Sequence, residues 1–278
     1  MKTKTRCLFV LSLVSCFSVC GCVVTPRDKS MAPASYDPYD CVGNGTGFCV
    51  TENGYFLTNY HVVKDADQVR ITIDSSDHEI VAEVVKTNPR VDLALLKADG
   101  TFKPVRFASE TEFRLGEAIW VLGFPNPDRQ GTSIKVTQGC VSSEKGPQDE
   151  DRSFQMDAAV QPGNSGSPVI NEYGEVIGVA AGQLIEEEVL KESGRTPQNV
   201  NYAIKGSYIT RFLFWSPCEG KFLRGSCWLT RTKRNAIERV RKSTALVRVY
   251  KEQELPVVFD DYRHFPALPP PPSPELTK

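Results

Sequence analysis

Short, strand-like runs recur along most of this chain and limit the folds open to it. From Gly45 to about Ile209, segments rich in Val, Ile, Thr and aromatic residues are separated by Gly, Pro, Asn and Asp. Many short strands at near-regular spacing predict an all-β sandwich or barrel. The less regular stretch 102–116 indicates a crossover between two barrels. The predicted strands are 47–50, 55–58, 69–73, 80–85, 93–97, 118–123, 133–142, 154–157, 168–170, 176–180 and 200–204.

Residues 1–21 are typical of an export signal. A basic start precedes an apolar stretch that is too short to span a bilayer as a helix. The stretch ends in Val19-Cys20-Gly21-Cys22, which resembles a bacterial lipobox and predicts lipidation at Cys22, with residues 22–42 as a tether. The alternatives are lipidation at Cys16 and a plain secretory signal, and all three predict export to a bacterial membrane or beyond it. Val23 favours the outer membrane where the host has one.

The charge and the cysteines restrict the partners and the compartment. The formal net charge is −1, so no global field indicates nucleic acid or an acidic substrate. Five cysteines follow the lipobox in a chain predicted to meet oxidising conditions. Cys218 and Cys227 enclose a short segment and are the best candidates for a disulfide. Cys41 with Cys49 is a weaker pair, because a lone cysteine in a strand is often a core residue. Cys140 would then be buried and unpaired.

Residues 213–265 differ in character and predict a small α/β extension. Positions 230–242 are strongly basic and fit a helix with Ala236, Ile237 and Val240 on one face, and a strand-like segment at 245–250 follows. We expect the basic face to be solvated, with contact to anionic lipid as the alternative. Residues 266–278 contain four consecutive prolines and predict an extended spacer.

A histidine, an aspartate and a serine stand in that order beside strand-like residues. Their surroundings are Leu57-Thr58-Asn59-Tyr60-His61-Val62-Val63, Val91-Asp92-Leu93-Ala94-Leu95-Leu96 and Gly163-Asn164-Ser165-Gly166-Ser167-Pro168. A serine hydroxyl needs a base, a group that orients the base, and donors for the oxyanion. We therefore expect His61 as general base, Asp92 as the orienting carboxylate and Ser165 as nucleophile. The chain has three histidines, and His78 and His264 lack comparable surroundings.

The small residues around Ser165 suit a tight turn whose backbone N–H groups point at one spot. We expect the oxyanion donors to be the N–H groups of Gly163 and Ser165, with the N–H of Asn164 between them. Nothing in the pattern requires the Asn164 side chain. Donors of this kind each lower the barrier by roughly 3 kcal/mol.

These motifs carry a family resemblance. Together with Gly45-Thr46-Gly47-Phe48, Asp157-Ala158-Ala159 and residues 199–204, they resemble the trypsin-like domain of HtrA-type proteases. The resemblance implies a chymotrypsin-like double β-barrel over residues 43–212 and a serine endopeptidase that acts on proteins or peptides through an acyl-enzyme. Residues beyond 209 lack the carboxylate-binding loop of a PDZ domain, so we expect no PDZ module, and regulation and assembly do not carry over. No cofactor or metal is expected, and the oligomeric state is not predicted.

The resemblance also implies where specificity lies. It places Ala159, six residues before the nucleophile, at the base of the S1 pocket, with Asn201, Tyr202 and Ala203 at its border. A small apolar base predicts cleavage after Val, Ala or Leu. Residues 166–169 and 174–178 also look like glutamyl endopeptidases, but the chain has no histidine between His78 and His264 to bind glutamate. The competing hypotheses are an inert or gated protease-fold scaffold and an esterase.

Overall fold

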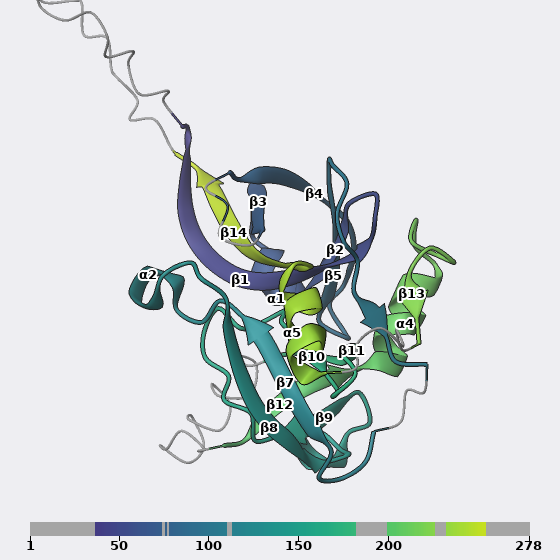
Figure 1. The fold of residues 1–278 in the computed structure, drawn as a ribbon. Helices are drawn as coiled ribbons and strands as arrows, with labels where there is room; N and C mark the ends of the chain where they lie inside the picture. The colour runs from purple at the N-terminus through teal and green to yellow at the C-terminus, as the bar shows by residue number, and fades with distance from the viewer. Residues whose placement is uncertain are drawn as a thin grey trace, which may run out of the picture. The chain divides into compact units, whose positions relative to one another are not determined.

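The computed structural model describes residues 37–73, 76, 78–109, 113–181, 199–225 and 232–253. The signal segment, Cys22, most of the predicted tether, Cys227 and the proline-rich tail lie outside these residues. Every predicted strand overlaps an observed one (Figure 1). The elements are β1 (Tyr39–Thr51), β2 (Tyr55–Thr58), α1 (Tyr60–Val63), β3 (Gln68–Ile73), β4 (Ile80–Asn88), β5 (Leu93–Ala98), β6 (Arg106–Phe107), β7 (Ala118–Gly123), α2 (Pro127–Gln130), β8 (Lys135–Ser143), a 3-10 turn (Pro147–Asp149), β9 (Ser153–Met156), β10 (Pro168–Ile170), β11 (Glu175–Ala180), β12 (Asn201–Lys205), α4 (Gly206–Phe214), β13 (Leu223–Arg224), α5 (Lys233–Arg241) and β14 (Thr244–Glu252).

The first barrel is closed by six strands in the order β1-β14-β3-β4-β5-β2. Successive side chains of a strand point to opposite faces of the sheet, so alternate residues fill the interior. Cys49, Phe56, Ile71, Leu96 and Val247 form part of that core, and all are fully buried. The predicted alternation of apolar residues therefore becomes the lining of this barrel.

The second barrel is built from β10, β7, β8, β9, β12 and β11, and the pairing of β10 with β11 closes the ring. Ile119, Phe154, Met156 and Val169 pack in its interior and are fully buried. The short strands β6 and β13 continue the sheet beyond β11. The architecture is the chymotrypsin-like double barrel that the family resemblance implied.

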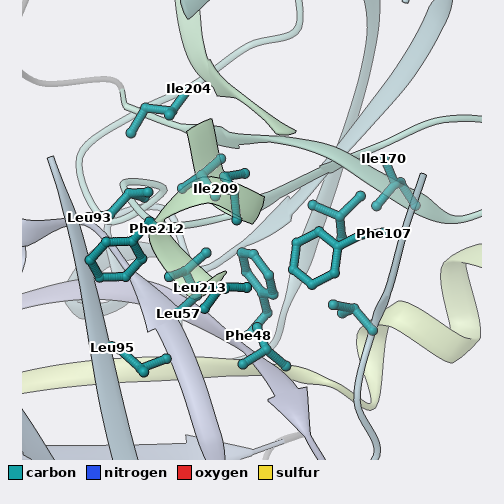
Figure 2. Close-up of a cluster of buried hydrophobic side chains, with 14 of the residues drawn as sticks. Phe48, Leu57, Leu93, Leu95, Phe107, Ile170, Ile204, Ile209, Phe212 and Leu213 are labelled. Carbon is teal, nitrogen blue, oxygen red and sulfur yellow. The ribbon is translucent and has the colours of Figure 1, made fainter. Parts of the chain in front are cut away.

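A separate apolar core joins the two barrels (Figure 2). Phe48, Leu57 and Leu95 alternate along their strands with residues of the first barrel's interior, so they face out of that barrel. They meet Phe107 and the buried face of α4 around Phe212. Burial of each side chain of this size contributes about 1.5–3 kcal/mol to stability, so this core holds the two barrels together.

The C-terminal segment enters the first barrel. β14 pairs antiparallel with β1 and with β3, so the first and last strands lie side by side (Figure 1). α5 buries Ala236 and Val240, as its amphipathic pattern predicted. The sequence analysis assigned these residues to an extension after the protease domain, yet β14 is one of the six strands of the first barrel. β1 likewise begins at Tyr39, inside the predicted tether.

A partly buried ion pair joins β14 to Glu79, the residue directly before β4. Glu79 Oε1 lies 2.5 Å from Arg248 Nη1, and the Tyr250 hydroxyl donates to the same carboxylate at 2.7 Å. The Arg70 guanidinium lies 4.2 Å from the centroid of the Tyr250 ring. Partial burial alone would raise the pKa of Glu79, but the hydrogen bonds from Tyr250 and Arg248 outweigh it and hold that pKa below its usual value.

The cysteines correct one prediction and leave another open. Cys41 and Cys49 are both free thiols on β1, one exposed and the other buried. Eight residues of a strand span roughly 26 Å, far beyond the reach of a disulfide, so the suggested Cys41–Cys49 pair is wrong. Cys140 is unpaired, but it is partly exposed. Cys218 is a buried free thiol. Its predicted partner Cys227 lies outside the described residues, so that pairing stays a prediction.

Within the described ranges, no helix has both the length and the apolar character needed to cross a membrane. The same part of the chain contains no cluster of His, Cys, Asp or Glu side chains suited to hold a metal ion.

Candidate functional site

His61 and Asp92 form a closely bonded pair on the first barrel. His61 lies on the single turn α1 that follows β2, and Asp92 ends the turn before β5. His61 Nδ1 lies 2.7 Å from Asp92 Oδ2, and the His61 backbone N–H donates to Oδ1 at 2.8 Å. A carboxylate only accepts hydrogen bonds, so Nδ1 carries the proton and Nε2 presents its lone pair. The pair therefore fixes the tautomer that a general base requires.

Asp92 is held in a conformation unusual for its residue type. Its φ angle is 56°, in the left-handed region that costs a non-glycine residue about 1 kcal/mol or more. Its carbonyl accepts the Asn59 side-chain amide at 2.9 Å and the Tyr60 N–H at 3.2 Å. These bonds come from the residues just before His61, so the same short segment positions both members of the pair.

Ser165 follows a tight turn on the second barrel. The Asn164 N–H donates to the Gln161 carbonyl at 2.9 Å, and the Asn126 N–H donates to the Pro162 carbonyl at 2.8 Å. Gly163, at φ 96°, occupies the position where such a turn demands a positive φ angle. A Cβ there would lie 2.4 Å from the Phe124 carbonyl oxygen, so glycine is also required by close packing.

Two backbone donors on this turn are left open. Within the described residues, neither the Gly163 N–H nor the Ser165 N–H donates to any acceptor. The Asn164 N–H, predicted as a third oxyanion donor, is already engaged by Gln161. Its inclusion was wrong, because the turn that exposes its neighbours consumes it. The Asn164 side chain is buried, and its Oδ1 has no partner in the described part of the chain.

The serine turn lies against β1 and the end of β2, the strand that leads to His61. A Cβ on Gly166 would approach Thr46 O at 2.0 Å and Thr58 Oγ1 at 2.5 Å, so the turn is in direct contact with the β1 backbone and with the Thr58 side chain. Ser165 itself is 3% exposed. His61 Nε2 is buried and has no hydrogen-bond partner among the described residues, so it is not bonded to the Ser165 hydroxyl. Such bonds are often long in free enzymes and tighten when substrate binds.

Of the predicted specificity residues, Ala159 and Asn201 are at least partly exposed, whereas Ala203 is buried. Ala159 is exposed, and its carbonyl accepts the Thr137 hydroxyl at 2.9 Å. The Asn201 amide donates to the Ala158 carbonyl at 2.9 Å, which ties β12 to the same segment. Ala203, in contrast, is fully buried in the second barrel's core, so its side chain does not line a pocket. Alternation along β12 sends it to the opposite face from Tyr202.

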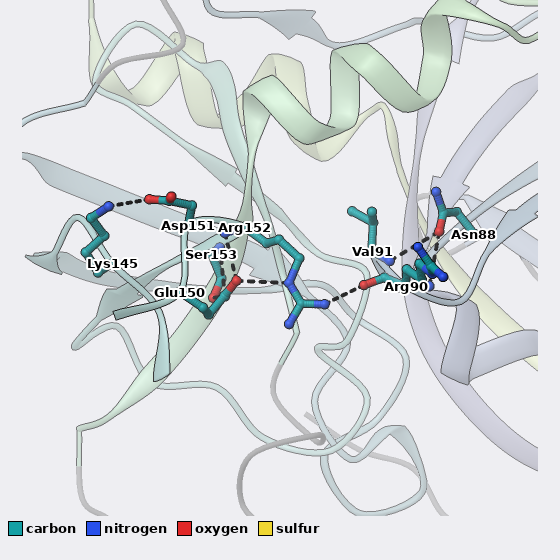
Figure 3. Close-up of polar contacts among 8 residues, drawn as sticks. All are labelled: Asn88, Arg90, Val91, Lys145, Glu150, Asp151, Arg152 and Ser153. Carbon is teal, nitrogen blue, oxygen red and sulfur yellow. Dashed lines mark hydrogen bonds and ion pairs between the residues drawn. The ribbon is translucent and has the colours of Figure 1, made fainter. Parts of the chain in front are cut away.

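A cavity of about 480 Å³, lined by Tyr202 and Asp92 among others, opens beside the pair. Its walls are the turn before Asp92 and the loop before β9, which lie on different barrels (Figure 3). Arg152 bridges them, because its Nη1 donates to the Arg90 carbonyl at 2.5 Å and its Nε to Glu150 at 2.9 Å. Partial burial would raise the pKa of Glu150, but hydrogen bonds from Ser153 and Arg152 lower it.

Comparison with known proteins agrees with this geometry. Residues 45–179 match the profile of the trypsin-like peptidase domain. An uncharacterized protein of Sinorhizobium fredii is 35% identical over 192 residues, covering 68% of this chain and 30% of that protein. A probable periplasmic serine endoprotease, DegP-like, of Pseudomonas putida is 44% identical over 140 residues, covering 49% of this chain and 28% of the relative.

Among solved structures, the serine endoprotease from Yersinia pestis superposes with a TM-score of 0.50 at 28% identity, covering 60% of this chain and 55% of that one. The chain spans about a third of the length of the curated relatives it matches. The matched residues 45–179 supply strands to both barrels, while β12 and β14 complete the barrels from beyond that stretch. Residues 45–179 of this chain are thus similar to the trypsin-like peptidase domain family.

Proposed function

We propose that this protein is a serine endopeptidase that uses His61, Asp92 and Ser165. The observation that carries the proposal is the His61–Asp92 pair, bonded at 2.7 Å and 2.8 Å, together with a serine turn that packs on β1 and leaves two N–H groups open. Each partner is one that acyl transfer requires, and each comes from a different element of the fold.

The chemistry follows from the positions of the protons. Ser165 Oγ attacks the scissile carbonyl carbon while its proton passes to His61 Nε2. The carbonyl oxygen becomes an oxyanion that accepts the N–H groups of Gly163 and Ser165. The C–N bond then breaks as His61 gives its proton to the leaving amine, and water repeats the sequence to release the acyl group. Asp92 stabilises the imidazolium throughout.

Specificity and location are parts of the same proposal. Ala159 offers no fixed charge at the base of the pocket, which supports cleavage after Val, Ala or Leu. The relatives named as periplasmic endoproteases support export, and the lipobox supports a lipid tether at Cys22 on the periplasmic side. A peptide library cleaved equally well after Arg and after Val would contradict the specificity.

Metabolic labelling with a clickable palmitate tests the tether. We expect the protein to incorporate the label and Cys22→Ala to lose it.

The central test is reaction of the full chain, purified in mild detergent, with a fluorophosphonate probe. We expect labelling that maps to Ser165 and vanishes in Ser165→Ala, with both proteins giving the same melting temperature. Folded wild-type protein that does not label would refute the active enzyme and favour an inert or gated scaffold. Labelled protein that cleaves esters but no peptide in a library would favour an esterase.

A further inference from the structure

We propose that Thr46 is a positioning residue that aims the oxyanion donors at the substrate. This role rests on the proposed function, because it concerns the N–H groups of Gly163 and Ser165. Thr46 lies on β1 of the first barrel and is fully buried, whereas the serine turn belongs to the second barrel. Its contacts therefore cross from the barrel of the histidine to the turn of the nucleophile.

The direction of each N–H is set by the carbonyl that shares its peptide plane. In a trans peptide, the C=O of one residue and the N–H of the next point in opposite directions. The Pro162 carbonyl is held by Asn126, so the Gly163 N–H points away from Asn126. The Asn164 carbonyl is held by the Ser167 N–H at 2.9 Å, so the Ser165 N–H points away from Ser167.

Thr46 fixes the two remaining carbonyls of this turn. Its hydroxyl donates to the Gly163 carbonyl at 2.7 Å, and its N–H donates to the Ser165 carbonyl at 2.8 Å. The Gly163–Asn164 peptide lies between the two peptides that carry the open N–H groups of Gly163 and Ser165. Rotation of this peptide would break the Thr46 hydroxyl bond and would also release the Asn164 N–H from its turn. By holding the peptide between the two donors, Thr46 resists the rearrangement that would turn them away.

The Thr46 hydroxyl is fully used and shielded. It accepts the Phe124 N–H at 3.1 Å while it donates to Gly163, and the Thr46 carbonyl accepts the Thr58 hydroxyl at 2.7 Å. Because the site is buried, water does not replace the hydroxyl when it is removed. Loss of this one oxygen leaves both the Gly163 carbonyl and the Phe124 N–H without a partner.

A set of variants separates positioning from stability. Thr46→Val keeps the shape and removes the hydroxyl, Thr46→Ser restores it, and Thr46→Cys offers a weak donor. Thr244→Val is the matched control, because Thr244 is equally buried and its hydroxyl donates to the Val240 carbonyl of α5 at 2.9 Å, not to the serine turn. The probes are a fluorophosphonate and p-nitrophenyl acetate, with melting temperature recorded for each full-length protein.

We expect Thr46→Val to lower the labelling rate and kcat by about 10²-fold, the effect of losing an oxyanion donor, with KM little changed. Thr46→Ser and Thr244→Val should stay within about threefold of wild type, and Thr46→Cys should fall between, which keeps the test valid where Thr46→Val does not fold. Wild-type rates in Thr46→Val or Thr46→Cys, or equal losses in Thr46→Val and Thr244→Val, would overturn the role. Wild-type protein that fails to label at all would instead refute the proposed function, and this role with it.

Discussion

Asp92→Asn should disable the site without unfolding it. In the wild type, Asp92 Oδ1 accepts the His61 backbone N–H and Oδ2 faces the protonated Nδ1. An asparagine has one acceptor and one donor in the same places. The backbone N–H cannot change its role, so the amide oxygen turns to it and the NH₂ group faces Nδ1. His61 must then carry its proton on Nε2, where a general base needs a lone pair.

The size of the effect follows from this geometry. Turning the amide the other way would leave the buried His61 N–H facing a donor, at about 1–3 kcal/mol, so the productive tautomer is populated roughly 5- to 150-fold less. Loss of the carboxylate charge also removes its stabilisation of the imidazolium. The combined effect seen in such triads is about 10⁴-fold in kcat, or roughly 5 kcal/mol of barrier.

The measurement is the rate of fluorophosphonate labelling and of p-nitrophenyl acetate hydrolysis by the full chain at pH 7. Asp99→Asn makes the same chemical change at an aspartate that is fully exposed at the end of β5, and it should leave both rates unchanged. Melting temperatures should agree within a few degrees for all three proteins. Folded Asp92→Asn that retains more than about a tenth of the wild-type rate would refute the assigned role of this carboxylate.

Three further predictions follow from packing and charge. Gly166→Ala should abolish activity and lower the melting temperature sharply, because its Cβ would lie 2.0 Å from a β1 carbonyl oxygen, whereas Gly116→Ala, also at positive φ but in open space, should cost only about 1 kcal/mol. Glu79→Gln should lower the free energy of urea unfolding at pH 7 by about 1.5–3 kcal/mol. The folded-state pKa of Glu79 lies below its unfolded value, so its contribution is present above the unfolded pKa and is lost as pH falls through the folded one, and the two proteins should converge in acid. Iodoacetamide at pH 8 should alkylate exposed Cys41 in the native protein but Cys49 only in urea, because burial raises the pKa of the Cys49 thiol to about 12, and mass spectrometry reads both.

Local pattern predicted the elements well and their partners less well. Apolar alternation around Phe56 and Leu96 is a property of the strand itself, so each strand was visible in the sequence. The same pattern at 245–250 predicted a strand but not its neighbours, because β1 and β3 lie far away along the chain. His61, Asp92 and Ser165 were predicted as a site because acyl transfer demands those residue types, and the structure bonds the first two of them.

Contacts made through the backbone escaped prediction. The Asn164 N–H was taken as an open donor, since a sequence does not reveal which N–H a turn consumes. The part played by Thr46 depends on the direction of two carbonyl groups, and that direction exists only after both barrels have folded. The lining of the cavity beside Asp92 likewise comes from loops of different barrels, which local pattern does not bring together.

The place of β14 bears on when the first barrel can form. Phe48 of β1 pairs with Thr244 of β14, which lies close to the other end of the described chain. β1 and β3 therefore keep open edges until β14 has been synthesised and pairs between them. The barrel that carries His61 and Asp92 is incomplete until nearly all of the described chain has emerged, so the order of the strands sets when this barrel can close.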